Sequence, residues 1–425
     1  MAEDWKDVRH NLDHSAKFAS IYNSPYYSDA IYDKFSDAEY QRRYRHAREI
    51  MERDGFDALL LTGGQSIYRP GDAVTWATGL IDARGMCQYA VFPKEGETTL
   101  IYPHSGSHIE AARRMVSIRD VRSSEGGQYA KVIADRLKEI GVERGRIGIT
   151  ACDRHGPEYM GIKTFNELIA LLPNATFEFL PNLLHELTAV KSAEEIEAMA
   201  KAGELAMDAM KTLVATARPG IREYQLAAAG THAILNGGGR MHLMMIGSTS
   251  MLEPKLVFPN PLPSHRVLKE GDLILPEIIA LYKGYYAKLG HPITIGPPTS
   301  EIQAFFKDVT LAGYKAIRAE LMPGKTLEDV RRAGKTFRDR GAQSRPSIVH
   351  GVDLLTASPN IHIDRVKASP VDEIIQPGNV FCIDIAPIQA DGSYGLFMTR
   401  TFVITADGQR NLVPFPEDEI AVAGV

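Results

Sequence analysis

The stretch Gly271–Pro292, GDLILPEIIALYKGYYAKLGHP, constrains the fold of this chain more than any other stretch. Its apolar runs predict two buried strands, and the residues around Lys283-Gly284 predict the turn that joins them into a hairpin. Glu277 and Lys288 interrupt these apolar runs. Glutamate and lysine are almost never fully buried unless they are paired. The hairpin therefore contains either a buried ion pair or a functional site.

The composition excludes several classes of protein. The 425 residues are 44% hydrophobic and 24% charged with a net charge of -5, which is typical of a globular protein with room for two cores. We find no basic stripe for nucleic acid, no apolar run long enough for a membrane span, and no signal-peptide core near the N-terminus. The three scattered cysteines favour a reducing cytoplasm over a disulfide framework.

The first part of the chain alternates between strand and helix patterns. Residues 1–36 are rich in Tyr, Ser and Asp, and they are either an arm that docks on the body or a partner, or a mobile tail. In residues 37–184, apolar strand runs such as Ala58–Thr62 alternate with helical stretches such as Gly127–Ile140. This alternation predicts an α/β domain. No phosphate-binding glycine motif follows any of these strands.

A second domain is predicted for residues 185–425. Ser192 and Glu195 form a capping box that opens a long amphipathic helix, and a second helix, Glu223–Leu235, follows it. A further pair of helices lies after the hairpin, and the last third of the chain reads as strands and loops. Two helix pairs packed on a strongly bent antiparallel sheet give an α+β domain.

Short phrases of the sequence resemble the creatinase/aminopeptidase P/prolidase family, which has the "pita-bread" fold. Their order and spacing over roughly residues 37–410 carry the resemblance. The phrases are Val190-Lys191-Ser192-x-x-Glu195-Ile196, Lys269-Glu270-Gly271-Asp272, Tyr282-Lys283-Gly284-Tyr285, Met322-Pro323-Gly324-Lys325-Thr326, His350-Gly351 and Gln376-Pro377-Gly378-Asn379. The resemblance implies a creatinase-like N-terminal domain, then a catalytic domain. Hydrolases of this family use five metal ligands, Asp, Asp, His, Glu and Glu, around two divalent ions.

This chain departs from that ligand pattern. By the resemblance, the five positions hold Glu277, Lys288, His350, Asp384 and Thr399. A lysine ammonium has no lone pair for a metal and repels a cation. We therefore predict neither a two-metal site nor any other cofactor, as in the creatinase and ectoine hydrolase branch, whose members are metal-free.

Four of these residues are the predicted catalytic group: Glu277, Lys288, His350 and Asp384. Glu277 suits acid–base work or cation binding, and the alternative is a structural pair with Lys288. Lys288 can orient an oxyanion, act as a base if burial depresses its pKa, or simply face solvent. His350 can hold the substrate or move its proton near neutral pH.

Five further residues are predicted to bind substrate, although a surface or packing role is an open alternative. Arg400 could hold a substrate carboxylate through two hydrogen bonds, or strand alternation could point it away. The five are His242, His265, Tyr282, His291 and Arg400.

The predicted function is a metal-independent, creatinase-like hydrolase of a small amide, amidine or cyclic C–N substrate rather than of a peptide bond. The alternatives are a lyase on the same scaffold, a catalytically dead binding protein, and an Xaa-Pro-peptidase-like metallohydrolase with a degenerate metal site. The predicted partner is a small-molecule substrate, with no nucleic acid and no membrane. The resemblance further implies a homodimer, and we expect a cytoplasmic location.

Overall fold

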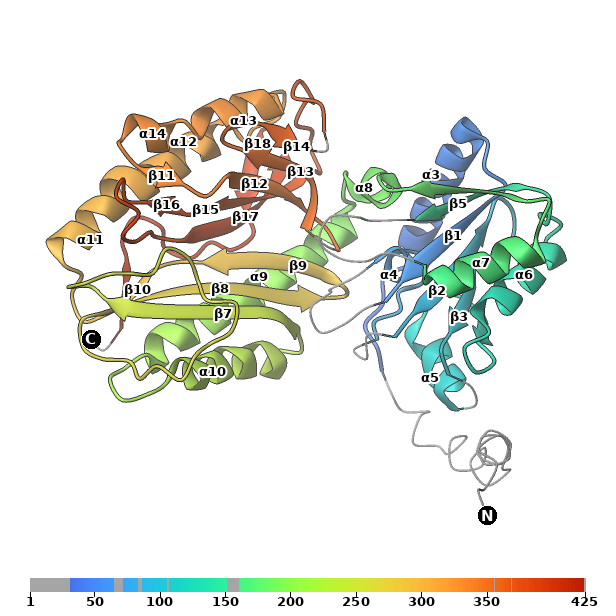
Figure 1. The fold of residues 1–425 in the computed structure, drawn as a ribbon, viewed down its shortest axis with the longest axis horizontal. Coiled ribbons are helices and arrows are strands. Elements are labelled where there is room, and N and C mark those ends of the chain that lie inside the picture. The colour runs from blue at the N-terminus through green and yellow to red at the C-terminus, as the bar shows by residue number, and fades with distance from the viewer. Residues whose placement is uncertain are drawn as a thin grey trace, which may run out of the picture. The chain divides into compact units, whose positions relative to one another are not determined.

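The computed structural model describes residues 31–64, 72–82, 86–104, 107–150, 160–354, 356–367 and 369–423. It divides into two compact units, Met1–Leu187 and Thr188–Val425 (Figure 1). Most of the arm predicted for residues 1–36 lies outside the described residues.

The first unit is built on a six-stranded sheet in the order β4-β3-β2-β1-β5-β6. Its strands are β1 (Ala58–Gly63), β2 (Gln88–Pro93), β3 (Thr99–Tyr102), β4 (Asp120–Ser123), β5 (Arg146–Thr150) and β6 (Thr176–Leu180). β2 runs antiparallel to both β1 and β3, while the β3–β4, β1–β5 and β5–β6 pairs are parallel. The mixed sheet and its helices confirm the predicted α/β class.

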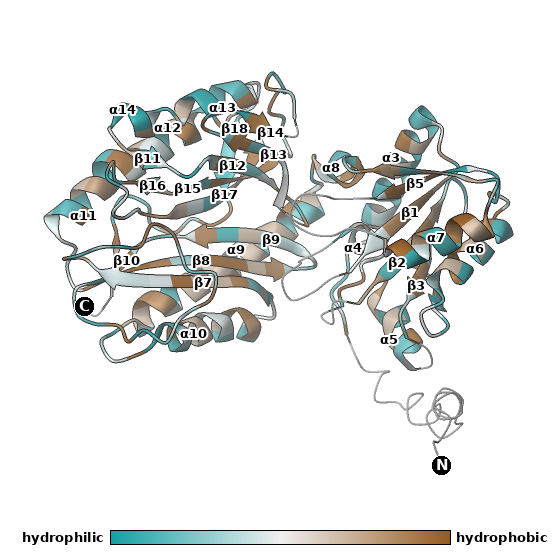
Figure 2. Cartoon of the chain, in the orientation of Figure 1, coloured by the Kyte–Doolittle hydropathy of each residue, from teal (hydrophilic) through white to brown (hydrophobic). Residues whose placement is uncertain are grey.

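Helices accompany this sheet in the described part of the chain, and α6 and α7 bury apolar residues against it. They are α3 (Asp37–Asp54), α4 (Ala73–Thr78), α5 (Ser107–Met115), α6 (Tyr129–Glu139), α7 (Ile162–Leu171) and α8 (Leu183–Thr188). The α6 residues Ile133 and Leu137 and the α7 residue Leu168 share one core with Leu60 and Ile147 of the strands. In Figure 2 the strands of this unit are largely brown, whereas α6 and α7 carry both colours. The sequence analysis did not predict α4 and β4, which are short.

The second unit is built on an eleven-stranded sheet with the main order β14-β13-β12-β15-β17-β9-β8-β10-β19, on which β7 pairs with β8 and β18 with β17. The strands are β7 (Arg240–Ser250), β8 (Asp272–Tyr282), β9 (Tyr285–Gly290), β10 (Ile293–Ile295), β12 (Ser347–Val352), β13 (Thr356–His362), β14 (Val366–Lys367), β15 (Val380–Ile385), β17 (Met398–Thr405), β18 (Gly408–Asn411) and β19 (Ala421–Ala423). A separate small pair joins β11 (Gln343–Ser344) to β16 (Pro387–Ile388).

Two groups of helices pack on this large sheet, as the pita-bread resemblance implies. α9 (Ala193–Thr216) and α10 (Glu223–Asn236) share a core with β8 and β9. The others pack with β12, β15 and β17; they are α11 (Ser300–Phe305), the π-helix η2 (Phe306–Leu311), α12 (Ala312–Glu320), α13 (Leu327–Ala333) and α14 (Thr336–Asp339). The first helix of the pair predicted after the hairpin is thus interrupted by the π-helical segment η2. No helix among the described residues is long and apolar enough to cross a membrane.

The opening hairpin of the sequence analysis is the β8–β9 pair. Lys283 and Gly284 both have positive φ, 49° and 85°, as a two-residue turn that matches the twist of its strands requires. Successive strand residues face opposite sides of a sheet. Ile278 and Leu289 therefore pack on the helices, while their neighbours Glu277 and Lys288 face the other side.

Candidate active site

One polar group lies on each of five consecutive strands of the large sheet. In the order β12-β15-β17-β9-β8, these groups are His350, Asp384, Thr399, Lys288 and Glu277. They are the five positions that the family resemblance singles out, and they come from segments up to 122 residues apart.

The strand register explains why these side chains share one face. Asp384 lies opposite Thr399, Thr399 lies opposite Gly290, and Gly290 lies opposite Glu277, so the four form one row across the sheet. Lys288 is two residues from Gly290 and has the same orientation. A Cβ atom on Gly290 would lie 2.5 Å from the Phe397 ring and 2.8 Å from the methyl carbon of Thr399. Glycine is therefore required in the middle of this row.

Lys288 is the centre of the charged cluster. Its Nζ atom lies 2.7 Å from Glu277 Oε1 and 2.9 Å from Asp384 Oδ2. All the charged groups are buried, with exposed fractions of 4% for Glu277, 5% for Lys288, 3% for His350 and 8% for Asp384. Charges buried this deeply need opposite charges beside them. The hairpin therefore contains an ion pair that is extended to a third residue on β15.

These contacts set the protonation of Lys288. Burial alone would lower its pKa, but the adjacent Asp384 and Glu277 carboxylates outweigh burial and raise the pKa well above its ordinary value. The ammonium is the stable form near neutral pH, so this lysine is a fixed cation rather than a base.

His350 and Asp384 form the second contact of the cluster. His350 Nδ1 donates a hydrogen bond of 2.8 Å to the Gly351 carbonyl, which directs Nε2 toward Asp384 Oδ2 at 3.6 Å. Burial opposes protonation of the ring, but contacts with Asp384 and Cys382 raise its pKa to about 9. Burial would likewise raise the pKa of Asp384, but Lys288 and His350 hold it well below its ordinary value.

Two buried polar atoms of this pair make no hydrogen bond among the described residues. They are His350 Nε2, which is a donor when the ring is protonated, and Asp384 Oδ1, which is an acceptor. Buried polar groups are normally satisfied, so an orphan donor beside an orphan acceptor indicates a place for a ligand with the complementary pair.

Arg400 and His291 lie away from this cluster. Arg400 follows Thr399 and faces the opposite side of the sheet, where Nη1 donates to the Gly290 and Thr399 carbonyls at 2.6 and 2.9 Å. Its Nη2 atom lies 3.0 Å from His291 Nδ1. Burial and Arg400 lower the pKa of His291 to about 3, so its ring is neutral. Both side chains therefore stabilise the sheet on the face opposite the charged cluster, which we call the outer face.

Of the remaining predicted substrate-binding residues, His265 and Tyr282 are not gathered with the cluster, whereas His242 contacts Tyr286, which shares a face with Lys288. His242 lies in β7 at an irregular point of its pairing with β8, and its ring centroid is 6.4 Å from that of Tyr286. His265 is exposed and packs edge-on against Tyr224. Tyr282 is half-buried at the end of β8.

Cys382 is a member of the site that the sequence analysis did not select. It lies opposite His350, and its Sγ atom is 2.8 Å from Thr399 Oγ1. Strand alternation was the available signal, because Cys382 is two residues before Asp384 and must share its face.

Comparisons with known proteins identify the scaffold. A family model described as Creatinase/Prolidase N-terminal domain matches residues 43–190, and one described as Metallopeptidase family M24 matches residues 197–406. An uncharacterised hydrolase/peptidase of Sinorhizobium fredii is 23% identical over 414 residues, covering 90% of this chain and 97% of that protein. An Xaa-Pro dipeptidase of Pyrococcus horikoshii is 22% identical over 369 residues, covering 86% and 94%.

A solved structure supports the fold. The prolidase from Pyrococcus horikoshii OT3 superposes with a TM-score of 0.71 at 20% identity, covering 89% of this chain and all of that one. At this identity the likeness shows the fold alone.

These relatives correct the predicted function. The main prediction, a hydrolase of C–N bonds other than peptide bonds, is wrong, because the named relatives are dipeptidases. The creatinase-like, metal-independent description conflicts with a family model described as metallopeptidase. The comparisons do not place this chain in the creatinase and ectoine hydrolase branch.

A divalent metal is the group that such a family implies, and the side chains can be tested against it. An ammonium occupies the space between Glu277 and Asp384, and it offers three donors and no lone pair. Thr399 Oγ1 is hydrogen-bonded to Cys382 Sγ. Within the described part of the chain, no three His, Cys, Asp or Glu side chains are grouped to hold a metal ion. The residues present do not fit a pair of divalent ions.

Proposed function

The chain belongs to the creatinase/aminopeptidase P/prolidase family, and we propose from this that it hydrolyses the peptide bond of short peptides. One observation carries the proposal to the residues: His350 Nε2 and Asp384 Oδ1 are buried and lack hydrogen bonds to described residues. A short peptide offers carbonyl acceptors together with N–H or N-terminal ammonium donors, which complement this pair.

His350 is the proposed group for the carbonyl. With a pKa of about 9 the ring is protonated at neutral pH, so Nε2 can donate to the carbonyl oxygen and stabilise the negative charge that develops there. The Nδ1 bond to the Gly351 carbonyl holds the ring in place for this role. The same Nε2 proton is available to the leaving nitrogen when the C–N bond breaks.

The two carboxylates are proposed to divide the remaining work. Asp384 Oδ1 accepts from the substrate N–H or from an N-terminal ammonium, because this oxygen has no hydrogen-bond donor among the described residues. Glu277 is the candidate acceptor for the proton of the attacking water. Lys288 contacts both carboxylates, at 2.7 and 2.9 Å, and balances their buried charge.

A second candidate is a protein that binds short peptides without hydrolysing them. The observation that favours it is Lys288, whose ammonium neutralises the carboxylates that would otherwise act on water. Binding would then use the same orphan donor and acceptor without bond cleavage.

Turnover of a dipeptide panel separates the two candidates. Xaa-Pro dipeptides and other dipeptides are incubated with the enzyme, with and without added Mn²⁺, and released amino acids are measured by mass spectrometry. We expect release that falls at least tenfold in Asp384→Asn and His350→Gln, whereas Asp391→Asn, an exposed aspartate after β16, leaves it unchanged. Thermal stabilisation by dipeptides without release favours the second candidate, and neither response refutes both.

The homodimer and the cytoplasmic location rest on the sequence and the family resemblance. Both remain predictions. Size-exclusion chromatography with light scattering tests the homodimer.

A further inference from the structure

A pocket of about 430 Å³ lies in the first unit, apart from the cluster on the large sheet. Three segments form it: the first part of α3, the turn before β3, and the loop before β4. Its size is in the range of roughly 300–1,000 Å³ that is typical of small-ligand sites. Its lining includes Asp37, Arg48, Glu97, Thr98, Ile118 and Arg119.

Two buried polar groups of this pocket have no hydrogen-bond partner among the described residues. Thr98 is 2% exposed, and its Oγ1 atom makes no hydrogen bond to any residue that the structure describes. The Nε atom of Arg48 is also buried and unbonded, although its Nη2 atom donates to the Gly96 carbonyl at 2.7 Å. A buried hydroxyl and a buried guanidinium N–H that lack acceptors are costly in an empty pocket. They indicate a ligand that carries oxygen acceptors.

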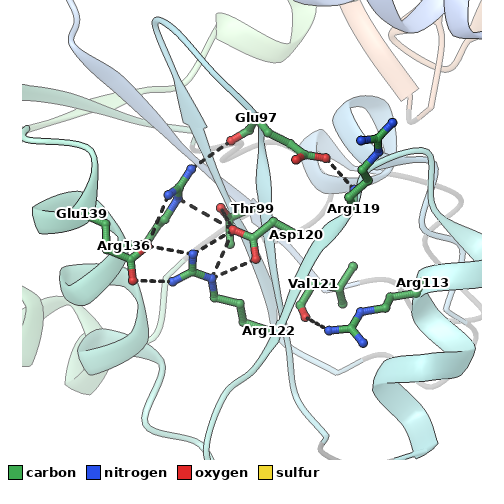
Figure 3. Close-up of polar contacts among 9 residues, drawn as sticks. All are labelled: Glu97, Thr99, Arg113, Arg119, Asp120, Val121, Arg122, Arg136 and Glu139. Atoms are coloured by element: carbon green, nitrogen blue, oxygen red, sulfur yellow. Dashed lines mark hydrogen bonds and ion pairs between the residues drawn. The ribbon is translucent and has the colours of Figure 1, made fainter.

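The wall that carries these groups is fixed in place. Gly96 has a φ of 93°, which favours glycine, and its turn presents the carbonyl that holds Arg48. Glu97 Oε1 accepts from the Arg119 backbone N–H at 2.7 Å, and the Glu97 carbonyl accepts from Arg136 at 3.2 Å (Figure 3). Arg48 lies 5.5 Å from the centroid of the Phe92 ring.

A network on the neighbouring strands secures the same segments. Thr99, which follows Thr98, donates to Asp120 Oδ2 at 2.6 Å, and Arg122 joins Asp120 to Glu139 (Figure 3). The strands that carry the two loops are therefore linked through side chains, and the pocket is preorganised rather than formed by mobile loops.

The lining carries charges of both signs. Arg48 and Arg119 are cationic, Asp37 and Glu97 are anionic, and Tyr40, Tyr44 and Ile118 add aromatic and apolar surface. The Glu97 carboxylate accepts a hydrogen bond from the Arg119 backbone N–H. Guanidinium groups match carboxylates through paired hydrogen bonds, while a carboxylate matches an ammonium. A ligand with both charges and a short apolar part fits this lining.

We propose that this pocket binds a free α-amino acid as its zwitterion, with Arg48, Thr98 and Arg119 on the carboxylate and Asp37 facing the ammonium. The site is separate from the peptide-hydrolysing cluster and does not depend on the activity proposed for it.

Isothermal titration of the full chain with each natural L-amino acid tests this site. We expect at least one to bind, and we expect its N-acetyl and amide derivatives to bind at least tenfold more weakly because each lacks one charge. Thr98→Val, which removes only the hydroxyl, should weaken binding at least tenfold, and Thr98→Ser should retain it. Arg119→Ala should act like Thr98→Val, whereas Arg45→Ala, an exposed arginine on the same helix outside the pocket, should have no effect.

Several outcomes would overturn the inference. Equal binding of the N-acetyl derivative or of inorganic phosphate would identify a simple anion site, and no binding by any natural amino acid would refute the site altogether. Binding that Asp384→Asn abolishes but Thr98→Val leaves intact would place the ligand in the cluster instead. Dipeptide turnover without amino-acid binding here would reject this site and leave the proposed function standing.

Discussion

Lys288 Nζ lies 2.9 Å from Asp384 Oδ2, although 96 positions separate the two residues in the sequence. β17 lies between their strands, so the lysine side chain reaches across a neighbour to make this contact. The ion pair therefore forms only when β9, β17 and β15 have assembled in register. It ties the hairpin to the last third of the chain.

Replacing Lys288 by methionine should strongly destabilise the second unit. Glu277 would be left buried without its counter-ion and Asp384 would keep only His350, and breaking a buried pair in this way costs about 3–5 kcal/mol. The loss should shrink as the pH falls, because the stranded carboxylates then take up protons. Urea unfolding at pH 5 and pH 8 measures both effects.

The control for this change is Lys201→Met, since Lys201 makes an exposed pair with Glu204 and such pairs contribute roughly 0–1 kcal/mol. The triple change Lys288→Met, Glu277→Gln, Asp384→Asn should recover part of the lost stability. A Lys288→Met protein as stable as its parent at pH 8 would contradict the assigned ion pair.

Replacing Lys288 by aspartate should convert the cluster into a cation site. The change removes the ammonium and adds a carboxylate beside Glu277, His350 and Asp384, which are oxygen and nitrogen donors that divalent ions accept. We expect Mn²⁺ to raise the melting temperature of Lys288→Asp by several degrees more than that of the parent. Metal analysis after dialysis should show higher occupancy. Lys211→Asp, an exposed change on α9, is the control, and an equal response of all three proteins would argue against this account.

Stability should depend on pH through His350. The pKa is about 9 in the folded protein and about 6.5 in the unfolded chain. The folded pKa is the higher one, so the stabilisation is fully present below about pH 6.5 and is lost as the pH rises through 9. The full effect is about 3 kcal/mol.

Urea unfolding of the parent and of His350→Gln between pH 6 and pH 10 checks this dependence. The difference in the free energy of unfolding should be largest at pH 6 and should decline toward pH 10. His46→Gln, on the exposed face of α3, should show no such trend. A constant difference would mean that the ring does not hold its extra proton in the folded state.

The sequence is sufficient to predict the local parts of this structure. The apolar runs and the Lys283-Gly284 turn specify the hairpin, and the capping box at Ser192 specifies the start of α9. Both signals lie within a few residues of the feature that they predict. The family phrases extend this reading to the order of the domains.

Contacts between distant strands are not readable in the same way. A one-residue shift of register would move Lys288 to the other face of the sheet, so its contact with Asp384 depends on pairings that only the folded sheet defines. The unbonded atoms Thr98 Oγ1 and His350 Nε2 are a further example. Whether a polar atom finds a partner depends on every segment around it, and no local pattern encodes that result.

The sequence left two orientations open for the Arg400 side chain, one toward the substrate and one away from it. In the structure it donates to the Gly290 and Thr399 carbonyls and contacts a neutral His291 ring. Burial lowers the pKa of this guanidinium to about 10, which still leaves it charged near neutral pH. Its role is therefore to satisfy buried acceptors on the outer face.

Replacing Arg400 by methionine should destabilise the protein by at least about 2 kcal/mol, because each acceptor left unsatisfied in the interior costs roughly 1–3 kcal/mol. Arg400→Lys should recover only part of the loss, since an ammonium cannot reproduce the planar geometry of a guanidinium. Arg410→Met, an exposed change on β18, is the control for both. A substrate-binding arginine would behave differently: its loss would raise KM for the best dipeptide and leave the urea midpoint unchanged. That result would place Arg400 on the inner face and contradict the register of β17.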